Sequence, residues 1–417
     1  MQIIESRRAF IAGIGAAAVM PVADAFGGAA TNGAEALRFR VLPHLQLLKE
    51  NRVAVVWMTK TKATGYVTWS QDGWKTTHTA WRETDGLLDA NFYVHKTVID
   101  GFDPHLRLEY RAHSRTIGNF GPYNVSYAGE EDAVDGAMDA ILPEDGSVSW
   151  AMFNDVHENL DIYDKLVRHL DGISSFCVFN GDIINHVDDE EDVAHRLLSP
   201  LSRVSQEARL PVWYLRGNHE TRGGFARNLR DYLALKNARY YGAATLGGVR
   251  FVFLDTGEDK QDGHREYSGL VAFDHYLEAQ NAWLEREVAS AEWRNAKARI
   301  VVRHIPGPLT EQLVLNGWPW RHKLPRLDAM DAILKQANVT LCMSAHLHHW
   351  GWHDATVVRP YPMIVGGGLK LGNPQSHDNA TLVKCRLCAG KLTVQLFDQT
   401  GRVAIDKAIS TARGDLV

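Results

Sequence analysis

The chain has 417 residues, of which 45% are hydrophobic and 23% charged, and its formal net charge is −5. These proportions are typical of a globular protein, and the length predicts two or more domains. The acidic balance gives no electrostatic basis for a nucleic-acid-binding surface. Four cysteines in so long a chain do not form a disulfide framework.

The N-terminal segment has the features of an export signal. Paired arginines occur in Ser6–Ile11, a small-residue apolar run follows at Ala12–Val19, and Ala23–Ala25 offers a small-x-small cleavage site. The segment resembles a twin-arginine signal, so we predict that residues 1–30 direct the protein to the periplasm or the exterior. The apolar run is too short to span about 30 Å of hydrocarbon, and no other segment approaches that length, so we expect no stable membrane span.

Residues 35–118 carry a strand pattern. β-branched and aromatic runs separated by turn signals predict a small all-β sandwich domain. Phe102-Asp103-Pro104, followed by Leu106 and Tyr110, resembles the end of a fibronectin type III-like module. Residues 119–148 are rich in acidic and turn-forming residues, which predicts a connector.

Residues 149–417 contain five polar motifs, each preceded by a short apolar run that predicts a buried strand. The runs are Trp150–Phe153, Phe176–Phe179, Val212–Leu215, Ile300–Val302 and Val339–Met343. The motifs are Asn154-Asp155-Val156-His157, Gly181-Asp182-Ile183-Ile184-Asn185, Gly217-Asn218-His219-Glu220, His304-Ile305-Pro306 and Ala345-His346-Leu347-His348. Helical periodicity between the strands, as in 160–170, predicts an α/β layered domain. Such folds gather ligands at the carboxyl ends of their strands, so we expect these motifs to lie along one sheet edge.

In this order, the five motifs resemble the calcineurin-like metallophosphoesterase superfamily, over roughly residues 147–390. The resemblance implies a four-layer α/β/β/α sandwich, and the β domain before it is similar to that of purple acid phosphatases and their bacterial relatives. It also implies two metal ions. Asp155, His157 and His348 would hold the first ion, and Asn218, His304 and His346 the second, with Asp182 bridging both. Carboxylate and imidazole donors accept manganese, iron or zinc, so we expect two divalent or trivalent ions.

The same resemblance implies hydrolysis of a phosphate ester by attack of a metal-bridging hydroxide. We expect His219 to stabilise the transition state or act as a general acid, with Glu220 orienting it. Weaker candidates for substrate contacts are Asn185, His186, Arg222 and His349. For the last three, an exposed residue without a function is an equal alternative.

Three positions depart from family patterns. Asn185 stands where purple acid phosphatases have Tyr, so no tyrosinate-to-iron colour is expected. His157 replaces their glycine, which moves the chain toward the phosphodiesterase-like branch, and Ala345 replaces the usual glycine of the last motif. The Val365–Gly368 run predicts a flexible loop that could approach the substrate.

The sequence therefore predicts an exported dinuclear phosphoesterase acting on small phosphomonoesters or phosphodiesters, and it gives no signal for an oligomeric state. Two alternatives remain. One is a hydrolase of nucleotides or pyrophosphate bonds, which the same ligand set would serve. The other is a non-catalytic binding protein with structural metals.

Overall fold

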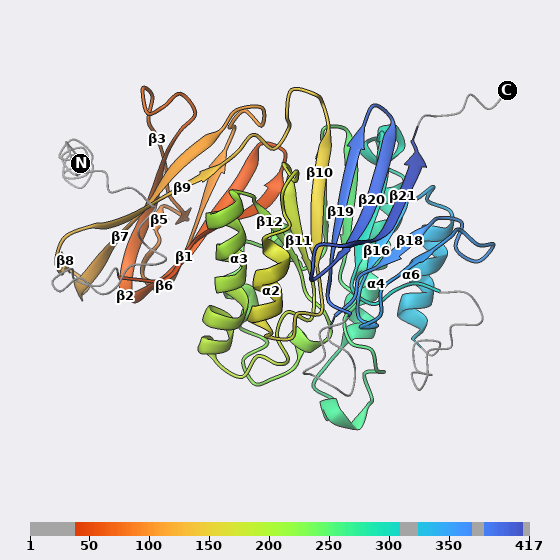
Figure 1. Ribbon diagram of the computed structural model, residues 1–417. Helices are drawn as coiled ribbons and strands as arrows, with labels where there is room; N and C mark the ends of the chain where they lie inside the picture. Colours follow the sequence, from red (N-terminus) through yellow and green to blue (C-terminus); the bar gives the residue numbers. More distant parts are fainter. Residues whose placement is uncertain (1–37, 309–323, 369–378, 412–417) are drawn as a thin grey trace. The chain divides into compact units, whose positions relative to one another are not determined.

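The computed structural model describes residues 38–308, 324–368 and 379–411, and Arg38–Val417 form one compact unit (Figure 1). The export signal expected at residues 1–30 lies outside the described residues and stays a prediction. Among the described residues, no helix combines the length and the apolar character needed to cross a membrane.

The N-terminal region is all-β, as predicted. Its strands are β1 (Phe39–Lys49), β2 (Arg52–Ser70), β3 (His78–Ala80), β4 (Glu83–Thr84), β5 (Leu87–Leu88), β6 (Ala90–Asp100), β7 (Leu108–Phe120), β8 (Val125–Tyr127) and β9 (Asp132–Met138). The long strand β2 pairs with β1 and β6 along its first half, and with β7 and β3 along its second. This exchange of partners wraps the strands around apolar side chains that include Trp57, Val67 and Tyr110.

Residues 119–148 contain more strand than the connector that we expected. β7 continues to Phe120, and β9 pairs antiparallel with β7 from Ser114↔Asp132 to Leu108↔Met138. The acidic residues that suggested a connector contact earlier parts of the chain, because Tyr66 of β2 donates a hydrogen bond to Glu131 and Arg38 forms an ion pair with Asp132. Contacts with residues distant in the sequence therefore hold an acidic, loop-like segment against the sheet.

The structure contains two large mixed sheets. The first continues the N-terminal strands, in the order β21-β20-β19-β10-β11-β12-β1-β2-β7-β8. Its further strands are β10 (Val148–Phe153), β11 (Phe176–Asn180), β12 (Val212–Leu215), β19 (Thr381–Cys388), β20 (Lys391–Asp398) and β21 (Val403–Ser410). The second contains β13 (Gly242–Leu246), β14 (Val249–Leu254), β15 (Ala298–Arg303), β16 (Leu341–Ser344), β17 (Gly351–His353) and β18 (Met363–Val365), in the order β13-β14-β15-β16-β18-β17. The five apolar runs before the motifs all contribute to strands, which confirms that prediction.

Helices cover the outer face of each sheet (Figure 1). The α- and π-helical elements are α2 (Leu160–Val167), η2 (Asp192–Leu198), α3 (Ser199–Arg203), η3 (Val204–Ala208), α4 (Phe273–Val288), α5 (Ala291–Asn295) and α6 (Pro325–Lys335). Short 3-10 turns are η4 (His219–Thr221), η5 (Leu229–Tyr232), η6 (Lys236–Ala238) and η7 (Arg265–Tyr267).

Strand alternation builds the layers. Trp150 and Met152 of β10 face the core between the sheets, whereas Ala151 and Phe153 face the core shared with α2. A third core lies between the second sheet and α4, α5 and α6. The result is the expected α/β/β/α sandwich.

Candidate dinuclear metal site

Every proposed metal ligand follows a strand. Asp155 and His157 follow β10, Asp182 follows β11, and Asn218 follows β12 in the first sheet. His304 follows β15, and His346 and His348 follow β16 in the second sheet. Within each sheet these strands run parallel, so their carboxyl ends lie at one edge.

The backbone is strained where these residues leave the strands. Positive φ angles occur at Asp155 (49°), His157 (47°), Asp182 (52°), His346 (74°) and His348 (56°). The left-handed region costs a non-glycine residue about 1 to 2 kcal/mol. Strain of this kind concentrates at functional sites, where the surrounding structure holds it in place.

Two glycines allow the β11 and β12 loops to approach each other. A Cβ atom at Gly181 would lie 2.4 Å from the backbone nitrogen of Gly217, and one at Gly217 would lie 2.2 Å from Oδ1 of Asp182. Real Cβ atoms do not approach so closely, so glycine is required at both positions for Asp182 to take its place.

The first group of side chains gathers Asp155, His157, Asp182 and His348, whose ligand atoms all lie within 4.8 Å of one another. Nε2 of His157 is 3.2 Å from Nε2 of His348 and 3.8 Å from Oδ2 of Asp182. Nε2 of His348 is 3.7 Å from Oδ1 of Asp155. Two imidazoles and two carboxylates around one point are a common donor set for a transition metal.

The second group gathers Asp182, His304 and His346, again within 4.8 Å. Nε2 of His304 is 3.2 Å from Oδ2 of Asp182. Asn218 joins this group, because its Oδ1 lies 3.0 Å from Nδ1 of His346. Asp182 therefore belongs to both groups, which is the position of a bridging ligand.

Buried polar atoms in the two groups fit a cation. Oδ1 of Asp155 and Nε2 of His304 have no hydrogen-bond partner among the described residues. The 3.2 Å contact of His304 with Asp182 is close, but it lacks the geometry of a hydrogen bond. Because an unsatisfied buried polar atom costs about 1 to 3 kcal/mol, a metal ion is the simplest partner for both atoms.

The electrostatics agree with this assignment. Burial opposes ionisation of Asp182, but the neighbouring His304 holds the pKa of that carboxyl well below its ordinary value. Burial likewise opposes protonation of His304, yet the Asp182 carboxylate raises the pKa of its ring to about 10. Burial lowers the pKa of His157 and His346, which favours the neutral ring that a metal requires. The buried carboxylate thus attracts a positive charge, which a bound cation can supply in place of the proton.

Comparison with known proteins identifies the domain. The family model described as calcineurin-like phosphoesterase matches residues 151–350. Residues 151–350 are a calcineurin-like phosphoesterase domain. Domains of this family are metal-dependent phosphoester hydrolases. No curated protein matches the chain.

A solved structure shares the fold. The purple acid phosphatase isolated from yellow lupin (Lupinus luteus) seeds superposes with a TM-score of 0.64 at 14% identity, over 88% of this chain and 74% of that one. Coverage of this size must include part of the N-terminal β region as well as the phosphoesterase domain. A second structure, a conserved uncharacterized protein and predicted phosphoesterase from Streptococcus pneumoniae, has a TM-score of 0.29 at 11% identity, over 63% of this chain and 98% of that one. It is too distant to support an argument.

Hydrogen bonds orient the ligand rings of the phosphoesterase domain. Nδ1 of His304 donates to the backbone carbonyl of Asn180 over 2.7 Å, which turns Nε2 toward Asp182. Nδ1 of His157 is 2.8 Å from Oδ1 of Asn185. Such outer hydrogen bonds fix the ring tautomer and strengthen the ligand. Asn185, which we expected to contact the substrate, therefore lies behind a proposed ligand.

His219 lies beside the two groups, with its Nε2 3.9 Å from Oδ2 of Asp182. Its Nδ1 donates to the backbone carbonyl of Asn185 over 2.8 Å. Its ring meets that of His157 edge to face, with the centroids 4.8 Å apart. Because Nδ1 is bound to the Asn185 carbonyl, Nε2 is the nitrogen of His219 that faces the ligand groups.

The role expected for Glu220 was wrong. Asn185, rather than Glu220, orients the His219 ring. The Glu220 carboxylate is fully buried and accepts hydrogen bonds from the backbone amides of Gly217, Asp182 and Ile183, at 2.8, 2.9 and 2.7 Å. Burial, and then the charge of Asp182, raise the pKa of Glu220 to about 7. Glu220 thus holds two ligand loops together from behind.

The weaker candidates are dispersed. His186 is half-exposed and pairs with Asp188, and these two form a separate group with Asp192. His349 is exposed and lies 3.4 Å from the Asn379 side chain. Arg222 lies next to His219 and is taken up below.

Sequence reasoning also missed two supports of Asp155. The Asn154 side chain donates to Oδ2 of Asp155 over 2.7 Å. A Cβ atom at Gly368 would lie 2.2 Å from Cβ of Asp155. The triple glycine expected as a flexible loop therefore contributes close packing behind a ligand, and three consecutive glycines after a buried strand were the available signal for such an approach.

Proposed function

We propose that this chain is an exported, dinuclear metal-dependent phosphoesterase that hydrolyses phosphomonoesters or phosphodiesters. The observation that carries the proposal is the position of Asp182 in both groups of ligand-type side chains. Asp155, His157 and His348 would hold one ion, and Asn218, His304 and His346 the other. When bound, such a pair of ions supplies Lewis acidity, activates water for attack on phosphorus and offsets phosphate charge. The oxygen and nitrogen donors suit manganese, iron or zinc.

The protein groups divide the remaining work. The carbonyl of Asn185 fixes the proton of His219 on Nδ1, so a second proton on Nε2 would make the ring a donor to a phosphate or leaving-group oxygen. The close approach of the β11 and β12 loops, fastened by Glu220, keeps Asp182 and Asn218 at a constant separation. Such preorganisation is what a two-ion site requires for in-line displacement.

Hydrolysis of p-nitrophenyl phosphate and bis-p-nitrophenyl phosphate, with and without a chelator, tests the activity. We expect turnover that the chelator abolishes and added metal restores. Asp182→Asn should lose turnover, whereas Asp331→Asn should keep it. Asp331 is a matched control because its carboxylate is also mostly buried, but it pairs with Arg303 outside both groups. Turnover that survives exhaustive chelation would overturn the proposal.

Export is supported by the twin-arginine pattern around Arg7 and Arg8. Cell fractionation of the wild type and of the Arg7→Lys/Arg8→Lys variant tests it. The wild type should accumulate outside the cytoplasm, and the variant inside. Equal distribution of the two proteins would contradict this part of the proposal.

A further inference from the structure

Arg222 has a restrained position beside His219. Its Nε and Nη2 donate to the two carboxylate oxygens of Glu258, both over 3.0 Å, and Nη2 also lies 3.3 Å from Oδ1 of Asp259. A bidentate pair of this kind fixes the plane of the guanidinium as well as its place. Glu258 is fully buried and also accepts a hydrogen bond from Thr221 over 2.7 Å, so the clamp itself is fixed.

The remaining nitrogen of Arg222 faces the metal-ligand groups. Nη1 is 3.3 Å from Nε2 of His219, and that same Nε2 is 3.9 Å from Oδ2 of Asp182. Nη1 carries two hydrogens; a His219 ring without a proton on Nε2 accepts one of them, and a ring protonated there accepts neither. Among the described residues no other side chain accepts a hydrogen bond from Nη1, and 28% of the Arg222 side chain is exposed. A donor with spare capacity therefore sits at an open position next to the proposed ligands.

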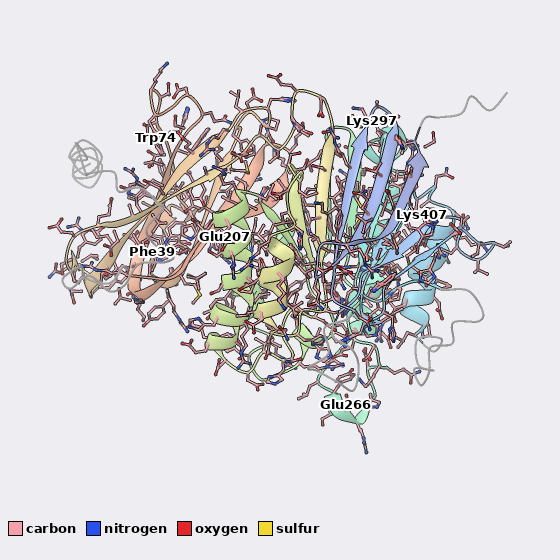
Figure 2. The ribbon with its side chains drawn as sticks, viewed as in Figure 1. Phe39, Trp74, Glu207, Glu266, Lys297 and Lys407 are labelled. Atoms are coloured by element: carbon pink, nitrogen blue, oxygen red, sulfur yellow. The ribbon has the colours of Figure 1, made fainter. Side chains whose placement is uncertain are left out.

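The carboxylates that hold Arg222 come from a different part of the chain. Glu258 and Asp259 lie in the segment between β14 and α4, which follows the carboxyl end of β14. Figure 2 shows Glu266, from the same segment, at the end of the molecule opposite Lys297, which precedes β15. Arg326 of α6 donates to the carbonyls of Glu258 and Lys260, which anchors the segment. Two buried carboxylates, Glu258 and Asp259, therefore fix the position of a partly exposed arginine.

We propose that Arg222 contacts the substrate by donating from Nη1 to a phosphoryl oxygen beside His219, and that Glu258 is the residue that positions it. This inference rests on the proposed phosphoesterase function. It adds a fixed positive group from the protein to the charge that the metal ions would supply. Because guanidinium matches phosphate geometry and stays charged, arginine suits this task better than lysine.

Calorimetric binding of inorganic phosphate to the metal-loaded protein tests the contact without needing turnover. Arg222→Met should weaken phosphate binding by about 10- to 100-fold, the range for one hydrogen bond to a charged group. Arg222→Lys, which keeps the charge and leaves Glu258 a partner, should still weaken binding by about tenfold because the fork is lost. The matched control is Arg250→Met, since Arg250 forms the same bidentate pair with Glu287, at 2.7 and 2.8 Å, near the start of β14. Its phosphate affinity should equal that of the wild type.

Kinetics on p-nitrophenyl phosphate test the positioning role of Glu258. Glu258→Gln should lower kcat/KM by about tenfold, and Arg222→Met/Glu258→Gln should be no worse than Arg222→Met, because Glu258 acts through Arg222. Equal phosphate affinities of Arg222→Met, Arg222→Lys and Arg250→Met would overturn the contact. Fully additive losses in the double variant would overturn the positioning role. If the wild type binds phosphate through Arg222 but hydrolyses no ester, the proposed function fails while this contact stands.

Discussion

Replacing Gly217 with alanine probes how closely the ligand loops must approach. The new Cβ atom would lie 2.2 Å from Oδ1 of Asp182 and 2.6 Å from its backbone nitrogen. Carbon and oxygen atoms approach to about 3.3 Å at closest, so the Asp182 carboxylate must move by about 1 Å. A displacement of that size at a reacting centre costs about 100-fold in rate. The backbone of Gly217 does not have a positive φ, so the effect is steric.

Steady-state hydrolysis of p-nitrophenyl phosphate, with metal content measured on the same samples, is the assay. Gly217→Ala should lose about 100-fold in kcat/KM. Gly224→Ala is the control, because a Cβ atom there meets nothing within 4 Å and its φ is not positive. It should keep wild-type activity. If Gly217→Ala matched Gly224→Ala in both activity and metal content, the loops could not be as close as the structure shows.

Three further predictions concern charge and hydrogen bonding. His219→Ala should retain both ions in elemental analysis yet lose most turnover; loss of the ions would instead make His219 a ligand. Glu220→Gln should destabilise the protein by about 1 to 3 kcal/mol in urea unfolding, because an amide NH2 would face backbone donors. An unchanged free energy of unfolding would refute the role of Glu220 in linking the two ligand loops. Burial lowers the pKa of His44 to about 3 and of His95 to about 4. Below about pH 6.5 these two histidines bind protons in the unfolded chain but stay neutral in the folded chain. Their contribution to the free energy of unfolding is therefore fully present above that pH and is lost as the pH falls. The loss is about 1.4 kcal/mol per pH unit for each histidine, or about 4 kcal/mol for the pair between pH 7 and pH 5. The His44→Gln/His95→Gln variant should show a flatter urea midpoint against pH, and an equally steep one would contradict the assignment.

The placement of the ligands at the carboxyl ends of strands was predictable because each motif follows an apolar run of strand length. The expected single sheet edge was wrong, because Asp182 follows β11 of the first sheet and His304 follows β15 of the second, so the site lies between the edges of two sheets. Local composition misled where long-range pairing decides the outcome. The acidic segment that contains β9 has the composition of a loop, yet β9 pairs with β7, and Arg111 of β7 donates a hydrogen bond to Asp135.

The contacts behind the ligands were not predictable for a similar reason. The partners of Glu220 are backbone amides, which carry no sequence signal, and two of them lie in the β11 loop. Glu258 sits in an irregular segment, and only the folded chain shows that it holds Arg222. Positive φ at Asp155 and His346 was not predictable either, because Asp and His are enriched in the left-handed region but most of them still have negative φ.

The most direct test of the whole account is the number of metal ions bound per chain. Elemental analysis of the purified, metal-loaded wild type should give two ions per chain, and Asp182→Asn should hold no more than one, because it loses the carboxylate shared by both groups. A wild type that binds fewer than two ions, or an Asp182→Asn variant that keeps both, would contradict the bridging position of Asp182 and the phosphoesterase mechanism built on it.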